Sequence, residues 1–125
     1  MQRFPARPES VGALRRAVGD YAENGGVAER RREDVALAVS EAASNVIVHA
    51  YADRDEPGDV QLDAWIDDGA LHVCVSDDGV GMTPRLDSPG LGLGLALIGQ
   101  VAERVRLESR DPQPGVCVRM TFALS

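Results

Sequence analysis

Glu41, Asn45 and His49 place a carboxylate, an amide and an imidazole four residues apart within a stretch free of Gly and Pro. In an α-helix this spacing aligns the three side chains along one stripe. The Asn45 amide oxygen is a hard ligand that suits Mg²⁺, and Glu41 can deprotonate a hydroxyl or a water. A solvated polar helix face is the structural alternative. For His49 we expect a supporting role, bonding the last backbone carbonyls of the helix.

A second group of candidate residues follows a predicted strand, in the pattern Asp77-x-Gly79-x-Gly81. A carboxylate at a strand end can accept a hydrogen bond from an amino group, such as the exocyclic amine of adenine. Gly79 and Gly81 would let a flat base lie close to the backbone. The alternative is a turn that the Asp77 side chain holds in place.

The third signal is the run GLGLGL, from Gly90 to Leu95, which precedes a predicted helix over residues 95–103. Gly90, Gly92 and Gly94 allow close backbone approach, and a helix N-terminus presents unpaired N–H groups that suit phosphate. Glycines also allow a helix to pack closely on a sheet, so the run alone is ambiguous. A Rossmann site would need a strand directly before the run, and here a hairpin and a loop come first.

The elements that must position these residues follow from the change in hydrophobic period along the chain. Apolar spacings of three and four predict helices, while alternation around Asp67-Asp68-Gly69 predicts a hairpin. We expect an α+β two-layer sandwich, whose mixed, mostly antiparallel sheet is covered on one face by about three helices. The predicted helices are 11–23, with Ser10 as N-cap, 33–51 and 95–103, and the predicted strands are 3–6, 60–66, 71–75, 105–109 and 116–124.

Composition excludes several classes of protein. The formal charge of −7 argues against direct nucleic-acid binding, and no apolar run is long enough to span a membrane. The N-terminus lacks the apolar core of a signal peptide, so we expect a cytoplasmic protein. The chain contains no lysine, which excludes a Walker P-loop and a eukaryotic-type protein kinase. Cys74 and Cys117 lack the spacing of a zinc or redox motif and are expected to be buried free thiols.

Together, and in this order, the three motifs resemble those of the GHKL ATPase superfamily, which has the Bergerat ATP-binding fold. ExxxNxxxHxY (Glu41 to Tyr51) is similar to its N-box, DxGxG (Asp77 to Gly81) to its G1 box and GLGLGL to its G2 box. The resemblance covers nearly the whole chain, so we expect one domain over residues 1–125. A histidine kinase would need an upstream helical domain with a phospho-acceptor histidine, for which the sequence shows no segment.

Within the superfamily, the opening FPARPESVGALRRAV and the His-Ala-Tyr ending of the N-box resemble the anti-sigma-factor serine kinases. The resemblance implies that Asp77 binds adenine, that Asn45 holds Mg²⁺ on ATP and that Glu41 is the general base. The glycines of both boxes and Leu95 would line the nucleotide, with Arg85 near the outer phosphates. The implied partners are a STAS-type anti-anti-sigma protein, phosphorylated on serine, and a sigma factor; a homodimer is compatible with the resemblance.

Two departures from the family pattern favour an alternative function. The segment 82–89 is a short lid, and Gly115-Val116 stands where many relatives have Gly-Thr. The alternative is a nucleotide-binding regulatory module that switches partners without efficient phosphoryl transfer. A third possibility, an interaction domain without nucleotide, would require all three motifs to be coincidental.

Overall fold

The computed structural model describes residues 2–50, 58–77, 91–109 and 115–125. Within these ranges, five strands form a single sheet in the order β1-β2-β3-β5-β4. Each of the four strand pairings is antiparallel. The strands are β1 (Gln2–Pro5), β2 (Asp59–Asp67), β3 (Ala70–Asp77), β4 (Arg104–Ser109) and β5 (Val116–Ala123).

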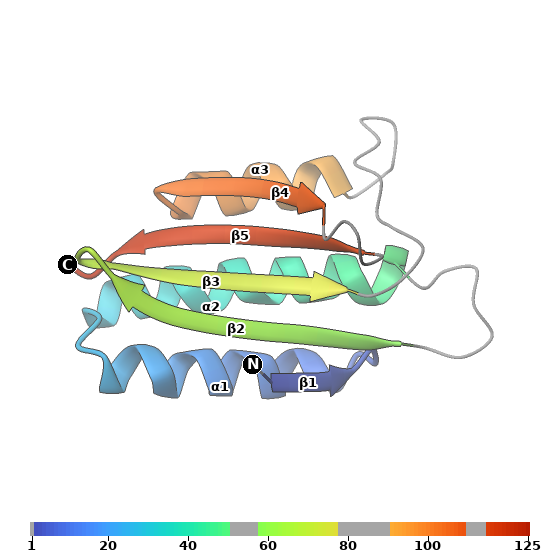
Figure 1. Ribbon diagram of the computed structural model, residues 1–125, viewed down its shortest axis with the longest axis horizontal. Coiled ribbons are helices and arrows are strands. Elements are labelled where there is room, and N and C mark those ends of the chain that lie inside the picture. Colours follow the sequence, from blue (N-terminus) through green and yellow to red (C-terminus); the bar gives the residue numbers. More distant parts are fainter. Residues whose placement is uncertain (1, 51–57, 78–90, 110–114) are drawn as a thin grey trace.

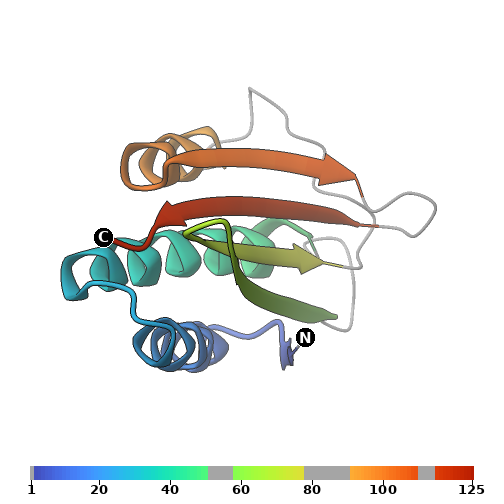
Figure 2. The ribbon, with the colours of Figure 1, turned by 60° about the vertical axis from the view of Figure 1, so that its left-hand side comes forward.

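Three helices cover one face of this sheet, namely α1 (Ser10–Asn24), α2 (Glu29–Asn45) and α3 (Leu91–Val101). A short π-helical turn, η1 (Val46–Ala50), continues α2. Helix α2 lies in the middle of the layer and packs against both α1 and α3 (Figures 1 and 2). The predicted two-layer α+β sandwich with a mostly antiparallel sheet is therefore confirmed. No helix in the described part of the chain is long and apolar enough to cross a membrane.

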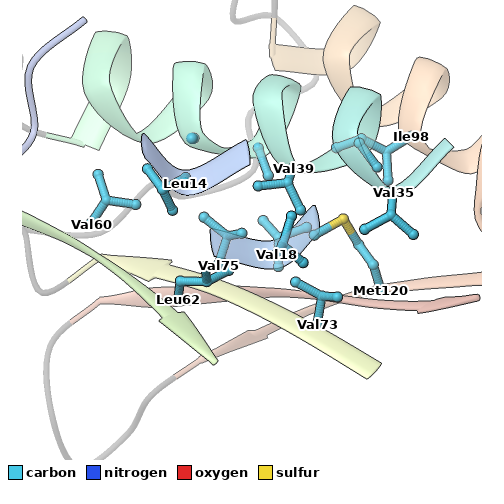
Figure 3. Close-up of a cluster of buried hydrophobic side chains, with 14 of the residues drawn as sticks. Leu14, Val18, Val35, Val39, Val60, Leu62, Val73, Val75, Ile98 and Met120 are labelled. Atoms are coloured by element: carbon cyan, nitrogen blue, oxygen red, sulfur yellow. The ribbon is translucent and has the colours of Figure 1, made fainter. Parts of the chain in front are cut away.

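The core lies between the two layers and is built mainly from aliphatic side chains. Leu14 and Val18 of α1, Val39 of α2, and Val73 and Val75 of β3 are all at most 1% exposed and meet there (Figure 3). Ile98 anchors α3 in the same cluster. Successive strand residues point to opposite faces, so the residues that alternate with Val73 and Val75 form an outer face that none of the described helices covers.

The hairpin turn between β2 and β3 is the one that the sequence predicts. Asp68 has φ 55° and Gly69 has φ 72°, so both central residues lie in the left-handed region. A two-residue turn of this kind matches the twist of the strands that it joins. The turn thereby fixes the register in which Trp65 lies opposite His72.

Three helix starts differ from the sequence predictions. Ser10 is the first residue of α1 rather than its N-cap, because the chain enters the helix through a turn in which the Ser10 N–H donates to the Arg7 carbonyl. Helix α2 begins at Glu29, four residues before the predicted start, because the extended Ala28 bonds through its N–H to Leu124. Helix α3 begins at Leu91, so it includes most of the glycine run.

Candidate functional site

Asn45 is the last residue of α2, and the helix is regular up to this point. Glu41 therefore lies one turn before Asn45 on the same side of the helix, as the sequence predicts. The Asn45 side chain is buried, at 7% exposure, whereas Glu41 is partly exposed. One polar group of the stripe thus reaches into the protein, and the other stays accessible from solvent.

The amide of Asn45 has no obvious structural reason to be buried. Its Nδ2 is inaccessible to solvent and has no hydrogen-bond partner among the described residues. Leaving a buried polar group unsatisfied costs about 1–3 kcal/mol, and such groups in native proteins are rare enough to suggest a function. The arrangement fits a ligand that accepts a hydrogen bond from the Asn45 Nδ2, or a metal ion that the Asn45 Oδ1 coordinates.

The helical period changes immediately after Asn45. Residues 46–50 form the π-helical turn, in which backbone hydrogen bonds span five residues instead of four. His49 lies in this π-helical turn. The α-helical spacing that would align His49 with Glu41 and Asn45 therefore does not continue beyond Asn45. Single π-helical turns inside α-helices are frequent at functional sites.

Asp77 is the last residue of β3 and is fully buried, at 0% exposure. The π-helical turn contacts β3, which brings the C-terminal end of the α2–η1 helix to the sheet. Figure 1 shows this helix end, the end of β3 and the start of α3 at the same end of the molecule. The fold therefore gathers at one end the three chain segments that carry the candidate residues.

Gly92, Gly94 and Leu95 lie in the first turns of α3 rather than in a loop before it. The unpaired N–H groups at the start of an α-helix are those of its first four residues, here 91–94. The glycine run consequently forms the helix N-terminus itself, where backbone N–H groups and the helix dipole favour an anion. Gly79, Gly81, Arg85 and Gly90 lie outside the described residues.

A cavity of about 410 Å³ on the outer sheet face contains none of the candidate residues. It is lined in part by Arg104, Arg106 and Arg119. The sequence gives no role to His72, yet its ring stacks on Trp65 with centroids 5.4 Å apart, and Thr121 lies 3.3 Å from its Nδ1. Cross-strand register alone could have revealed this pair, because Trp65 and His72 are directly opposite.

A helix end with a buried amide, a buried carboxylate at a neighbouring strand end and a glycine-rich helix start thus lie in a two-layer α/β sandwich, in the order in which the three motifs resemble those of the GHKL ATPases. The family model for the histidine kinase-like ATPase domain matches residues 4–122. The chain belongs to this family, and the resemblance to the GHKL ATPases is confirmed.

Curated relatives narrow the branch of the family. The chain is 32% identical to the serine-protein kinase RsbW of Bacillus subtilis (strain 168) over 138 aligned positions, which cover 98% of this chain and 84% of the relative. It is 31% identical to RsbW of Listeria monocytogenes serotype 4a over 84% of this chain and 65% of the relative. The branch that contains this chain therefore includes serine-protein kinases, as the sequence predicts.

Solved structures agree on the fold. The histidine kinase domain of the Erythrobacter litoralis EL346 blue-light activated histidine kinase matches with a TM-score of 0.66 at 25% identity. That match covers 97% of this chain and 62% of the other. The structure of the RsbU and RsbW domains of Rv1364c from Mycobacterium tuberculosis matches with a TM-score of 0.71 at 17% identity, over 99% of this chain and 32% of that one. The chain thus spans less than two thirds of either solved chain.

Proposed function

We propose that this chain is an ATP-dependent serine protein kinase that acts in the cytoplasm as an anti-sigma factor. It would phosphorylate a serine of a STAS-type anti-anti-sigma antagonist and sequester a sigma factor, with residues 1–125 forming one ATP-binding kinase domain. The observation that carries the proposal is the buried Asn45 amide, whose Nδ2 has no hydrogen-bond partner in the described part of the chain, at the same end of the fold as the buried Asp77. Relatives named serine-protein kinases support the kinase activity.

In this proposal the buried residues bind and orient the nucleotide. Asp77 would accept a hydrogen bond from the adenine amine, and Gly79 and Gly81 would let the base approach the backbone. The Asn45 Oδ1 would hold Mg²⁺, for which an amide oxygen is a suitable ligand. When bound, Mg²⁺ neutralises charge on the phosphates that are being transferred.

The start of α3 would receive the phosphates. The backbone N–H groups at Gly92 and Gly94 would donate to phosphate oxygens, and the absence of side chains there permits close approach. Gly90 and Leu95 flank these glycines in sequence, and Arg85 would add a positive charge near the outer phosphates. The chain has no lysine for this task, so backbone donors and one arginine would carry the binding.

Glu41 is suited to act on the substrate hydroxyl rather than on the nucleotide. It lies one helical turn from Asn45 and remains partly exposed, so a serine from a second protein can reach it from solvent. Its carboxylate would take the proton of that serine as the hydroxyl oxygen attacks, which is the work of a general base.

The test of this function is transfer of labelled phosphate from ATP to a STAS-type protein encoded nearby in the same genome. Glu41→Ala should reduce transfer by about 10²–10⁴-fold, the usual contribution of a general base, while ATP affinity stays within about twofold. Exposed Glu23→Ala is the matched control and should leave both quantities unchanged. Full transfer by Glu41→Ala would remove the proposed role, and a parallel loss of ATP binding would make Glu41 a binding residue.

The second candidate function is a nucleotide-gated binding module with little phosphoryl transfer. Val116, partly buried at the start of β5, offers no hydroxyl where many relatives of the resembled family carry Thr. The two functions separate in the same assay, because the module would bind ATP and change its partner affinity without transferring label.

A further inference from the structure

Cys74 and Cys117 meet on the outer face of the sheet, away from the proposed nucleotide site. They lie on β3 and β5, which are neighbouring antiparallel strands. Cys74 is opposite Arg119 and Cys117 is opposite Ser76, so the two cysteines are diagonal neighbours rather than a direct pair. Their Sγ atoms are nevertheless 2.9 Å apart, with the Cys117 thiol donating to Cys74.

This separation is close to that of a covalent link. A disulfide joins two sulfur atoms at about 2.05 Å, so these thiols need to approach by only about 1 Å more. Diagonal cross-strand neighbours are typically about 7–8 Å apart, at or beyond the roughly 6.8 Å upper end of the Cα separations that disulfides span, so closing the bond needs a small backbone shift and leaves it strained and more easily reduced. The geometry favours a reversible link over a permanent structural one.

The surroundings make the two thiols chemically unequal. The hydrogen bond from Cys117 lowers the pKa of Cys74, and the nearby Arg119 guanidinium lowers it further against the opposing effects of burial, Glu108 and Asp63. The same hydrogen bond, together with burial, raises the pKa of Cys117. In the strand register Cys74 lies opposite Arg119, whereas Cys117 lies opposite Glu108 of β4. Because a positive neighbour favours the thiolate, which is the reactive form of cysteine, Cys74 is the better nucleophile.

Both cysteines are within reach of a small oxidant. Each is only partly buried, and all three described helices cover the opposite face of the sheet (Figure 2). The sequence predicts buried free thiols; both cysteines are free, but the structure corrects their burial, because these two residues, 43 positions apart, meet on the sheet face that no described helix covers. Partial exposure beside a positive charge is the environment of redox-active cysteines.

We propose that Cys74 and Cys117 form a reversible disulfide between β3 and β5 when the protein meets hydrogen peroxide. The Cys74 thiolate attacks one peroxide oxygen, the S–O bond forms as the O–O bond breaks, and the departing hydroxide takes a proton to become water. The Cys117 sulfur then attacks the Cys74 sulfur, and the hydroxide released from the S–O bond takes the Cys117 proton. The two cysteines together lose two electrons, peroxide gains two, and two waters form.

The disulfide does not depend on nucleotide binding or kinase activity, so it can be tested on the full chain alone. Reduced protein is treated with hydrogen peroxide, digested without reductant and mapped by mass spectrometry. We expect a linked pair of peptides containing Cys74 and Cys117, in protein that remains unlinked to other copies and returns to free thiols with dithiothreitol. Absence of that linked pair, or disulfides between copies only, would overturn the proposal.

Single variants test which sulfur attacks first. In Cys117→Ser, Cys74 should still oxidise to a sulfenic acid that dimedone traps, whereas Cys117 in Cys74→Ser should react at least about tenfold more slowly. Alkylation of the reduced wild-type chain gives the same ranking if a variant fails to fold: Cys74 should be labelled before Cys117. Equal labelling rates would overturn the assignment of Cys74 as nucleophile.

Discussion

At the scale of single residues, the buried polar groups set the site apart from the rest of the core. Asn45 and Asp77 are at most 7% exposed, in a core otherwise made largely of aliphatic side chains. Burying an amide or a carboxylate costs free energy unless it is well bonded, so a fold selected for stability alone would place apolar residues there. In the proposed function, the Nδ2 of Asn45, which has no partner among the described residues, lowers stability in exchange for binding.

If burial of the Asn45 amide lowers stability and serves ligand binding, Asn45→Ala should change stability and ATP affinity to different extents. Removing the unsatisfied amide relieves a desolvation cost while leaving a small cavity, so the free energy of unfolding should change by less than about 1 kcal/mol. Mg²⁺-dependent ATP affinity should fall at least about tenfold, because the Oδ1 ligand is gone. Denaturant unfolding and titration calorimetry measure the two quantities.

Asn24→Ala is the matched control, because Asn24 is the exposed last residue of α1. It should leave ATP affinity unchanged. A loss of several kcal/mol of stability in Asn45→Ala, with ATP affinity intact, would show that the Asn45 amide is structural. That result would contradict its proposed role in binding.

At the scale of elements, the predictions made from the sequence succeed where one local pattern dominates. The β2–β3 hairpin can be predicted because alternating apolar and polar residues flank Asp68-Gly69, a residue pair that is strongly preferred in two-residue hairpin turns. The start of α2, in contrast, cannot be predicted from the spacing of apolar residues. Its first turn is charged, and some of its contacts are with chain segments distant in sequence: a guanidinium nitrogen of Arg31 lies 3.5 Å from a carboxylate oxygen of Glu103.

The π-helical turn at residues 46–50 could not be predicted either. Its residues, VIVHA, are compatible with an ordinary α-helix, and the change of hydrogen-bond pattern depends on how the helix end meets β3. The motif spacing therefore predicted that Glu41 and Asn45 share one side of α2, but it could not predict that His49 follows a change of helical period.

Two glycines provide a test of the hairpin turn with an internal control. An added Cβ would meet nothing within 4 Å at Gly69 or at Gly19, so steric crowding is absent at both sites. Gly69 has φ 72°, whereas Gly19 lies inside α1. Gly69→Ala should destabilise the protein by about 1–2 kcal/mol, the cost of a left-handed backbone for an L-residue.

Gly19→Ala should instead stabilise the protein by about 0.5–1 kcal/mol, because alanine loses less backbone freedom than glycine in a helix. Urea unfolding of both variants measures the two changes. Equal effects of the two substitutions would mean that backbone conformation does not limit the β2–β3 turn.

At the scale of the whole molecule, the two faces of the sheet have different surroundings. The inner face packs the helices, and the ends of α2 and β3 lie at the same end of the molecule as the start of α3. The outer face carries Trp65, Arg119 and the two cysteines, with the Arg119 guanidinium 5.3 Å from the Trp65 ring centre. Sequence periodicity predicts which residues share a face, but only the strand order shows which of them become neighbours.

A nucleotide bound at that end would contact all three elements, so it should stabilise the whole fold. Any ligand that binds only the native state raises the unfolding free energy, by about 2.7 kcal/mol when its concentration is 100 times Kd. For a domain of this size, that corresponds to a rise in Tm of about 10 °C. We expect Mg-ATP to give this shift in a thermal melt. Mg-GTP should give a smaller one, because guanine has a carbonyl oxygen at position 6, where adenine has the amine that would donate to Asp77.

Asp77→Asn separates base recognition from general phosphate binding in the same melt. An amide can accept as well as donate at this position, so the variant should still bind nucleotide, but the difference between the ATP and GTP shifts should shrink. Glu41→Ala, which the proposed mechanism confines to catalysis, should keep the full shift with Mg-ATP. An unchanged Tm for the wild-type chain at millimolar Mg-ATP would contradict both nucleotide-dependent functions, while an unchanged preference in Asp77→Asn would contradict only the role of that carboxylate.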